Sequence, residues 1–130
     1  MSETPIMMTE EERQFLRALY DDFNGRDIEA VLAKMQPDVE WANGMAGGFV
    51  YGRDGVREYW WQQFQVIQPH LETLRFEKDD RGRYVITVHQ VVRDMEGNVL
   101  MEKTVGQRFA MKDGLIQRFD ILEVPSQEAV

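Results

Sequence analysis

Apolar residues at the start of the chain recur at the spacing of an amphipathic helix. Thr9 is followed three residues later by Glu12, the pattern of a capping box at a helix start. The apolar positions that follow every three or four residues are Phe15, Leu16, Leu19, Tyr20 and Phe23. Asn24-Gly25 is a typical helix end. The pattern therefore predicts a first helix that begins after Thr9 and ends at Asn24-Gly25.

Two more helices and a short strand are predicted before residue 70. Asp27 can cap a second helix, which Pro37 would close, and a third helix is expected from Arg53 to Pro69. Residues 38–43 lie between these helices and have the apolar alternation of a strand.

The period changes to that of strands in the second half of the chain. Four apolar segments are separated by Gly-containing turns that are typical of hairpins. The predicted strands cover residues 71–78, 83–94, 98–112 and 115–124. Three helices with one early strand, followed by an antiparallel meander, predict an α+β fold.

The hairpin turns determine which side chains share a face of this sheet. If the strands pair symmetrically about the predicted turns, His89 lies opposite Lys103. The face expected to line an interior pocket then carries Thr87, His89, Val91, Val105, Gln107, Phe119 and Ile121. A register shift of one residue would exchange the two faces, and Gln90 and Asp120 would point inward.

The opposite face of the sheet is also expected to be covered. It would carry the apolar residues Tyr84, Ile86 and Val88 together with charges of both signs, Glu102, Arg108, Arg118 and Asp120. A sheet with one face in water should alternate cleanly between apolar and polar residues. Self-complementary charge suits a symmetric contact, so we expect a homodimer through this face, with Asp120 in an ion pair near Arg118.

The composition narrows the class of protein. The chain has 130 residues, which predicts a single domain over 1–130, with loosely ordered ends at 1–8 and 125–130. A net charge of −8 argues against a nucleic-acid partner, because such a surface repels phosphates. The acidic start and the absence of a long apolar segment predict a cytoplasmic protein without a membrane partner.

No metal or cofactor is expected. The sequence contains no cysteine, and its two histidines, His70 and His89, are on separate predicted strands without the spacing of a metal site.

Three segments resemble the nuclear transport factor 2-like superfamily. They are FNGRDIEAVLAKMQPDVEW, YGRDGVREYWWQQF and KDGLIQRFDILEV, and the resemblance covers residues 9–124. This superfamily includes SnoaL-like polyketide cyclases, ketosteroid isomerases and limonene epoxide hydrolase. The resemblance implies a cone, in which a strongly curved antiparallel sheet wraps around three N-terminal helices and encloses a mostly apolar pocket.

The resemblance does not transfer a known active site. The positions of the ketosteroid isomerase base, tyrosine donor and second acid fall at Trp41, Leu19 and Gly106, which cannot perform that chemistry. SnoaL-like cyclases use an acid near the last strands, where this chain has Asp120 and Gln107.

Limonene epoxide hydrolase is locally more similar. Its Tyr-x-Asn and the Gly-Arg-Asp that follows resemble Trp41-Ala42-Asn43 and Gly52-Arg53-Asp54, so the water-holding Asn is kept and the Tyr hydroxyl is lost. The positions of its acid relay fall at His89, Val91 and Ile121, and the relay is therefore absent.

Two polar residues are candidates for chemistry in the expected pocket. His89 could act as a general base or donor, and Asn43 could orient a water or a ligand carbonyl. The alternatives are a hydrogen-bonded structural histidine and an asparagine that turns the chain before Gly44. The expected walls are Trp41, Leu19, Tyr51, Trp60, Phe64, Thr87, Val91, Val105, Gln107, Phe119 and Ile121. Core packing is the alternative role of the aromatic residues among them.

Three functions remain open at this point. The first is binding of a small, largely apolar organic molecule, with cofactor-free acid–base chemistry of an isomerase, cyclase or hydrolase type. The second is a non-catalytic ligand-binding or carrier module, and the third is a dimeric protein-interaction domain. Two or more ionisable groups converging in the cavity would favour an enzyme, whereas a cavity with only His89 and amides would favour a binding protein.

Overall fold

The computed structural model describes residues 7–44 and 46–123. Most of the two ends that were expected to be loosely ordered lies outside these residues. Met8 is described, and the expectation is wrong for it, because its side chain is buried in the core with 7% exposed.

Three helices form, and the first matches its prediction. They are α1 (Glu10–Asn24), α2 (Ile28–Leu32) and α3 (Gly52–Gln63). The capping box is complete, since the Thr9 side chain accepts from the Glu12 backbone N–H and the Glu12 side chain accepts from the Thr9 N–H. The second and third helices are shorter than predicted. Pro37 and Pro69 lie within strands, where neither interrupts a helix.

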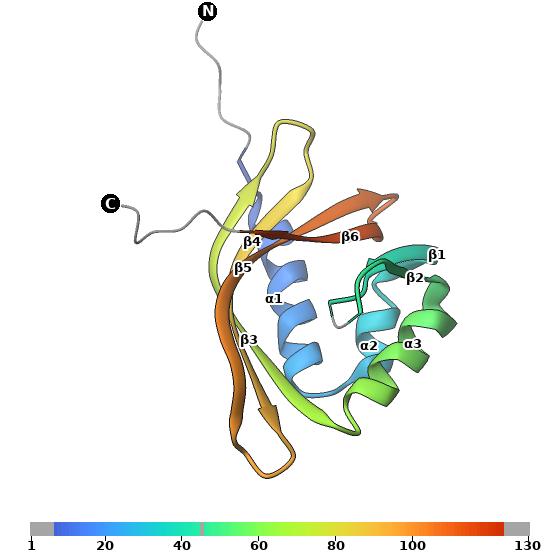
Figure 1. Ribbon diagram of the computed structural model, residues 1–130. Helices are drawn as coiled ribbons and strands as arrows, with labels where there is room; N and C mark the ends of the chain where they lie inside the picture. Colours follow the sequence, from blue (N-terminus) through green and yellow to red (C-terminus); the bar gives the residue numbers. More distant parts are fainter. Residues whose placement is uncertain (1–6, 45, 124–130) are drawn as a thin grey trace, which may run out of the picture.

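Six strands form one curved sheet. They are β1 (Met35–Ala42), β2 (Phe49–Tyr51), β3 (Ile67–Lys78), β4 (Tyr84–Asp94), β5 (Val99–Lys112) and β6 (Leu115–Glu123). The order is β2-β1-β6-β5-β4-β3, and only the β1–β6 pair is parallel. The predicted meander is therefore confirmed, while β2 was not predicted. Figure 1 shows the sheet bending around α1, with α2 and α3 beside the concave side.

The start of α1 is fastened to the edge of the sheet by a polar cluster. The Glu12 carboxylate lies 3.0 Å from Nζ of Lys78 and accepts a 3.0 Å hydrogen bond from the Tyr84 hydroxyl. Burial alone would raise the pKa of Glu12, but the hydrogen bonds from Thr9, Lys78 and Tyr84 lower it to about 2. The helix and the β3–β4 edge are thus joined through a charged contact.

The register between β4 and β5 differs from the predicted one by one residue. Close to the turn the prediction holds, because Arg93 pairs with Val99. The next pair is Val92 with Met101, so Leu100 is an extra residue on β5. Such a bulge shifts every later pair, and His89 lies opposite Thr104 in place of Lys103.

The bulge at Leu100 reverses the predicted face of β4. Tyr84, Ile86 and Val88 are buried in the interior, with 8%, 0% and 0% exposed, and not on the outer face as predicted. Val105 and Phe119 face the interior as expected, because the β5–β6 pairing keeps them on that face. The physical cause is that one inserted residue changes the parity of one strand relative to its neighbour.

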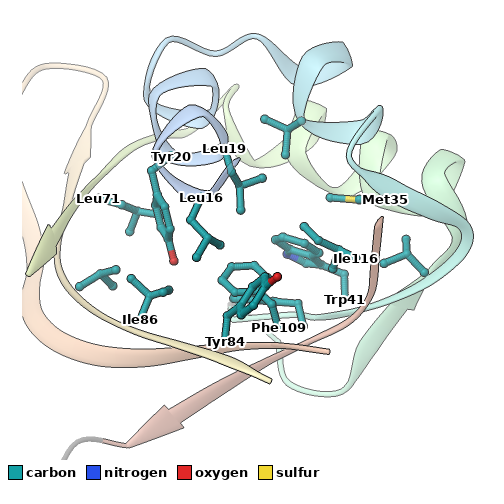
Figure 2. Packing of buried hydrophobic residues seen from close by; sticks show 14 of the residues in the cluster. Leu16, Leu19, Tyr20, Met35, Trp41, Leu71, Tyr84, Ile86, Phe109 and Ile116 are labelled. Atoms are coloured by element: carbon teal, nitrogen blue, oxygen red, sulfur yellow. The ribbon is translucent and has the colours of Figure 1, made fainter. Parts of the chain in front are cut away.

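Aromatic and aliphatic side chains from the helices and the sheet form one core. Figure 2 shows Leu16 and Tyr20 from α1 facing Ile86, Phe109 and Trp41 from the strands. The residues with under 2% exposure are Phe109, Leu16, Met35, Ile86, Ile116, Val31, Val39, Val56 and Val88.

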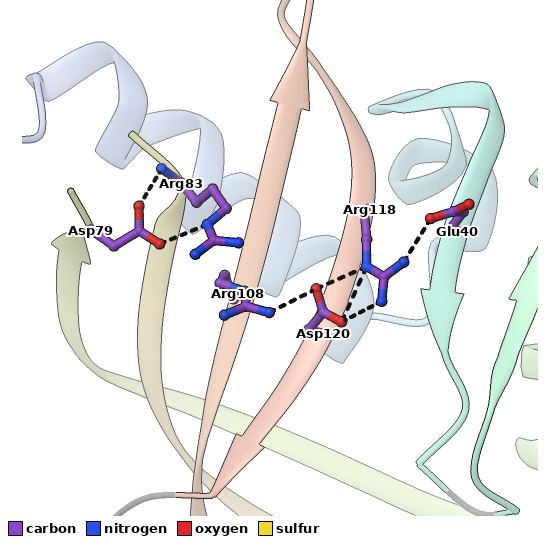
Figure 3. A network of polar contacts seen from close by, with 6 residues as sticks. All are labelled: Glu40, Asp79, Arg83, Arg108, Arg118 and Asp120. Atoms are coloured by element: carbon purple, nitrogen blue, oxygen red, sulfur yellow. Dashed lines mark hydrogen bonds and ion pairs between the residues drawn. The ribbon is translucent and has the colours of Figure 1, made fainter. Parts of the chain in front are cut away.

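The outer face carries a network of ion pairs over β1, β5 and β6. Arg118 lies 2.9 Å from Glu40 and 3.1 Å from Asp120, and Arg108 lies 3.3 Å from the same Asp120 (Figure 3). The predicted ion pair of Asp120 with Arg118 is therefore confirmed. The prediction that apolar residues on this face support a dimer is wrong, because Tyr84, Ile86 and Val88 are buried in the interior.

Among the described residues, no helix is both long enough and apolar enough to cross a membrane.

Candidate functional site

A cavity of about 140 Å³ lies between the curved sheet and the helices. Its wall includes residues of α1, α2, α3 and five strands. The lining residues are Leu19, Tyr20, Phe23, Val31, Trp41, Ala42, Gly44, Tyr59, Trp60, Gln63, Ile67, Pro69, Leu71, Gln90, Val92, Met101, Lys103, Val105, Gln107, Phe109, Phe119 and Ile121. Most of them are apolar, so the cavity favours an apolar occupant.

Seven of the predicted wall residues line this cavity. They are Leu19, Trp41, Trp60, Val105, Gln107, Phe119 and Ile121. Trp41 stacks on Phe119 with 4.2 Å between ring centroids, and its edge meets Trp60 at 5.1 Å. These contacts hold the three rings in place, so the aromatic wall exists before any ligand enters.

The other predicted pocket residues lie elsewhere. His89, Thr87 and Val91 are on the outer face, because they alternate along β4 with the residues that face the cavity. Tyr51 is 64% exposed at the end of β2. Phe64 packs edge-on against Phe23 at 5.6 Å behind the cavity wall.

His89 and Asn43, the two residues predicted to take part in chemistry, form contacts outside the cavity wall. Nε2 of His89 lies 2.8 Å from the Glu102 carboxylate on the neighbouring strand, outside the cavity. The Asn43 side chain accepts a 2.9 Å hydrogen bond from the Ala46 backbone N–H, which is how an asparagine closes a turn. Neither residue lines the cavity, whereas Gly44, the next residue after Asn43, does.

A buried hydrogen bond joins α1 to β5 inside the cavity. The Tyr20 hydroxyl donates to Oε1 of Gln107 at 2.6 Å, and both side chains are buried, with 4% and 7% exposed. Burial raises the pKa of Tyr20 well above its usual range, so the phenol keeps its proton and remains the donor. Because Oε1 accepts from Tyr20, the amide nitrogen is fixed on the other side of the group, and its NH₂ is the donor that Gln107 offers to another partner.

The polar groups of the cavity wall are amides, phenols and one amine. Gln90 and Lys103 face each other across the β4–β5 pair, and Gln63 donates to the Tyr59 hydroxyl at 3.1 Å. No aspartate, glutamate or histidine of the described residues lines the cavity. Those residues also contain no group of three or more potential metal ligands.

Sequence reasoning missed the most useful polar residues of the cavity. Tyr20 was recognised as part of the apolar stripe of α1, but its partner is 87 residues away and no local pattern reveals the pair. Gln90 was predicted on the outer face because symmetric pairing about the turn did not include the bulge at Leu100, which turns Gln90 into the cavity. Lys103 was placed on the interior face, although its alternation with Val105 and Gln107 was not recognised as a signal for a binding residue.

A family comparison supports the resemblance that the sequence segments indicated. The sequence model of the SnoaL-like domain matches residues 16–119, most of the chain. The chain belongs to the SnoaL-like domain family. This family is part of the nuclear transport factor 2-like superfamily, and the curved α+β sheet described above is consistent with its cone fold.

Solved structures with SnoaL-like or related folds are similar over most of the chain. TerC, which was co-crystallised with polyporic acid, is 28% identical with a TM-score of 0.72, and the match covers 84% of this chain and 88% of TerC. A nuclear transport factor 2-like protein of unknown function from Burkholderia pseudomallei K96243 is 24% identical, with a TM-score of 0.76 and coverage of 89% and 92%. Curated proteins give no match.

A more distant fold relative was also crystallised with a small molecule. It is a Mycobacterium tuberculosis protein in complex with estradiol-17beta-hemisuccinate, 13% identical, with a TM-score of 0.69 and coverage of 79% and 85%.

Proposed function

We propose that this SnoaL-like protein binds one small, largely apolar, oxygen-containing organic molecule in the cavity, without transforming it. The observation that carries the proposal is the Tyr20–Gln107 pair, which leaves an amide donor inside an aromatic wall. A ligand oxygen that accepts from this NH₂ would be held in a dry environment, where such a bond is well defined.

The size of the cavity restricts the ligand. At about 10–15 Å³ for each water-sized unit, 140 Å³ holds roughly nine to fourteen non-hydrogen atoms. Two fused six-membered rings with a small substituent have this size. The stacked Trp41 and Phe119 rings offer such a ligand a flat aromatic wall.

The polar lining favours binding over acid–base chemistry. An acid–base catalyst needs a group that exchanges a proton near the working pH. The cavity wall has no carboxylate or imidazole among the described residues, the Tyr20 phenol holds its proton, and the Lys103 amine belongs to an exposed residue. The co-crystal of TerC, the relative that is 28% identical, supports a small-molecule ligand for this fold.

The proposal is tested with 2-acetylnaphthalene and with 2-ethylnaphthalene, which lacks the carbonyl oxygen. Quenching of tryptophan fluorescence reports binding, because Trp41 and Trp60 line the cavity. The double variant Tyr20→Phe/Gln107→Leu removes both polar partners, so no buried group is left unsatisfied. Compared with Tyr20→Phe alone, the double variant should bind 2-acetylnaphthalene about fivefold more weakly, which corresponds to the loss of a hydrogen bond worth ~1 kcal/mol.

The controls separate loss of the amide from loss of the cavity. Affinity for 2-ethylnaphthalene should be the same in both variants, and Gln14→Leu on the exposed side of α1 should change neither affinity. Failure of both compounds to bind the unmodified protein would refute the proposed function. Equal weakening of both compounds would show that Gln107 contributes packing only.

We also propose that the chain forms a homodimer through the outer face of the sheet. One support is the network of positive and negative side chains around Arg118. The other is Nε of Arg108, which is buried and has no hydrogen-bond partner among the described residues. A symmetric contact would bring such charges face to face with their complements. Sedimentation at micromolar concentration should give twice 15.3 kDa, and Arg118→Glu should give the monomer.

The matched control for the dimer is Arg81→Glu, the same charge change in the exposed β3–β4 turn, which should leave the dimer intact. A monomer of the unmodified protein would refute the proposal, as would a dimer that Arg118→Glu does not affect.

A further inference from the structure

We infer that the cavity selects ligands that carry a negatively charged group, and that Lys103 at the mouth is the residue that recognises this group. The inference rests on the proposed function, because it names the chemical class of molecule that the same cavity accepts. The position of Lys103, the absence of a partner for it among the described residues, and the residues around it support the inference.

Lys103 lies on the interior face of β5. It alternates with Val105 and Gln107, both buried, and all three line the cavity. Lys103 itself is exposed, so it marks the open end of the cavity, while Gln107 lies deeper. The side chain can thus reach a ligand inside the cavity while its own charge remains partly hydrated.

The Lys103 amine has no partner among the described residues. The protein has 15 lysines and arginines against 23 acids, so most cations find a carboxylate or carbonyl. Only Lys103, Lys112 and Arg81 have side chains without a hydrogen bond, ion pair or ring contact in the described part of the chain. Lys112 and Arg81 lie next to hairpin turns, outside the cavity. Among the described residues, Lys103 is therefore the one cation without a partner that lines the cavity.

The described residues of the cavity wall around Lys103 carry no negative charge that would neutralise it. No acidic residue of the described chain lines the cavity. The residue directly across the strand pair is Gln90, whose neutral amide can donate a hydrogen bond beside the amine. An amine and an amide donor at one end of an apolar cavity match a carboxylate or an ionised enol, which accepts from both.

The two ends of the cavity together define the ligand. Lys103 and Gln107 are four residues apart on one strand, roughly 13 Å at about 3.3 Å per residue. The flexible lysine side chain can bridge part of this distance. The expected ligand is therefore an aromatic acid of about two fused rings, with its acidic group at Lys103 and a second oxygen acceptor at the opposite end near Gln107.

The test compares 2-naphthoate with 2-naphthamide, which has the same shape and the same number of non-hydrogen atoms but no charge at pH 7. Binding is measured by tryptophan quenching and confirmed by calorimetry, on the unmodified protein and on Lys103→Met. We expect Lys103→Met to weaken the affinity for 2-naphthoate about 3- to 10-fold, because a partly exposed ion pair is worth little more than ~1 kcal/mol. The affinity for 2-naphthamide should not change.

Two further variants make the result specific. Lys112→Met makes the same change of net charge on the same strand, outside the cavity, and should leave both affinities unchanged. Lys103→Arg keeps the charge and should retain most of the 2-naphthoate affinity.

Each alternative outcome has a distinct meaning. If Lys103→Met weakens both compounds equally, the lysine stem only packs against the ligand and the inference is wrong. If it weakens neither, or if Lys112→Met has the same effect, recognition of the acid at the mouth is also wrong, while the binding function stands. If neither naphthalene compound binds the unmodified protein, the proposed function itself fails.

Discussion

The charged contact at the start of α1 gives the most direct test of how this fold is held together. Glu12 is bound by Thr9, Lys78 and Tyr84, and its pKa is lowered from 4.5 to about 2. The difference of 2.5 units corresponds to at most about 3.4 kcal/mol at 1.36 kcal/mol per unit. Because 22% of the Glu12 side chain and 18% of the Lys78 side chain are exposed, solvent screening reduces this value, and we expect about 1–2 kcal/mol.

The substitution Glu12→Gln removes the charge while keeping a residue that can complete the capping box. At pH 7 it should lower the free energy of unfolding by about 1–2 kcal/mol, measured by urea denaturation. A folded-state pKa below the unfolded-state value stabilises the fold above pH 4.5, and this contribution is lost as the pH falls through 2. At pH 3, roughly 40% of the difference in free energy of unfolding between the unmodified protein and Glu12→Gln should remain.

The matched control is Glu11→Gln, which removes a charge from the same helix turn at an exposed position. It accounts for the interaction of any acid with the helix dipole, worth a few tenths of a kcal/mol. A double-mutant cycle with Lys78→Met isolates the ion pair. The reasoning is refuted if Glu12→Gln costs no more than Glu11→Gln at pH 7, or if its cost is the same at pH 7 and pH 3.

Two further predictions concern the outer network and the core. Asp120→Asn should lower the free energy of unfolding at pH 7 by about 1–3 kcal/mol, because Arg108 and Arg118 lose a shared carboxylate that is only 15% exposed. Burial would raise the pKa of Asp120, but the two arginines lower it below 3.8. The cost should therefore begin to fall below pH 3.8 and be lost as the pH falls through the lowered folded-state pKa; a cost at pH 2.5 equal to the cost at pH 7 in urea titrations would contradict the assignment. Leu16→Ala should cost about 2–5 kcal/mol in the same measurement, because the side chain is fully buried between α1 and the sheet. Leu74→Ala, at a 54% exposed position, is its control and should cost under ~1 kcal/mol.

Local sequence patterns determined the element order of this protein. The capping box at Thr9 formed as predicted, because its hydrogen bonds involve residues only three apart. The turn at Asp113-Gly114 formed as predicted, with positive φ at both residues (53° and 80°), as a tight hairpin turn requires. Val105, Gln107 and Phe119 face the interior as predicted, whereas Ile116, next to the turn, is buried with 0% exposed because the β5–β6 register shifts between Ala110 and Met111.

The tertiary structure alone decided the chemistry of the cavity. One bulged residue, Leu100, placed Gln90 in the cavity and His89 outside it, and no hydropathy pattern distinguished the two registers because both faces of β4 are apolar. The Tyr20–Gln107 bond joins a helix to a strand 87 residues later, and its partners meet only when the sheet bends around α1. Likewise, the absence of a partner for Lys103 among the described residues could be recognised only from the positions of the other charged side chains in the folded structure. Contacts between distant segments depend on register and curvature, which accumulate along the whole sheet and are not encoded in any short stretch of the chain.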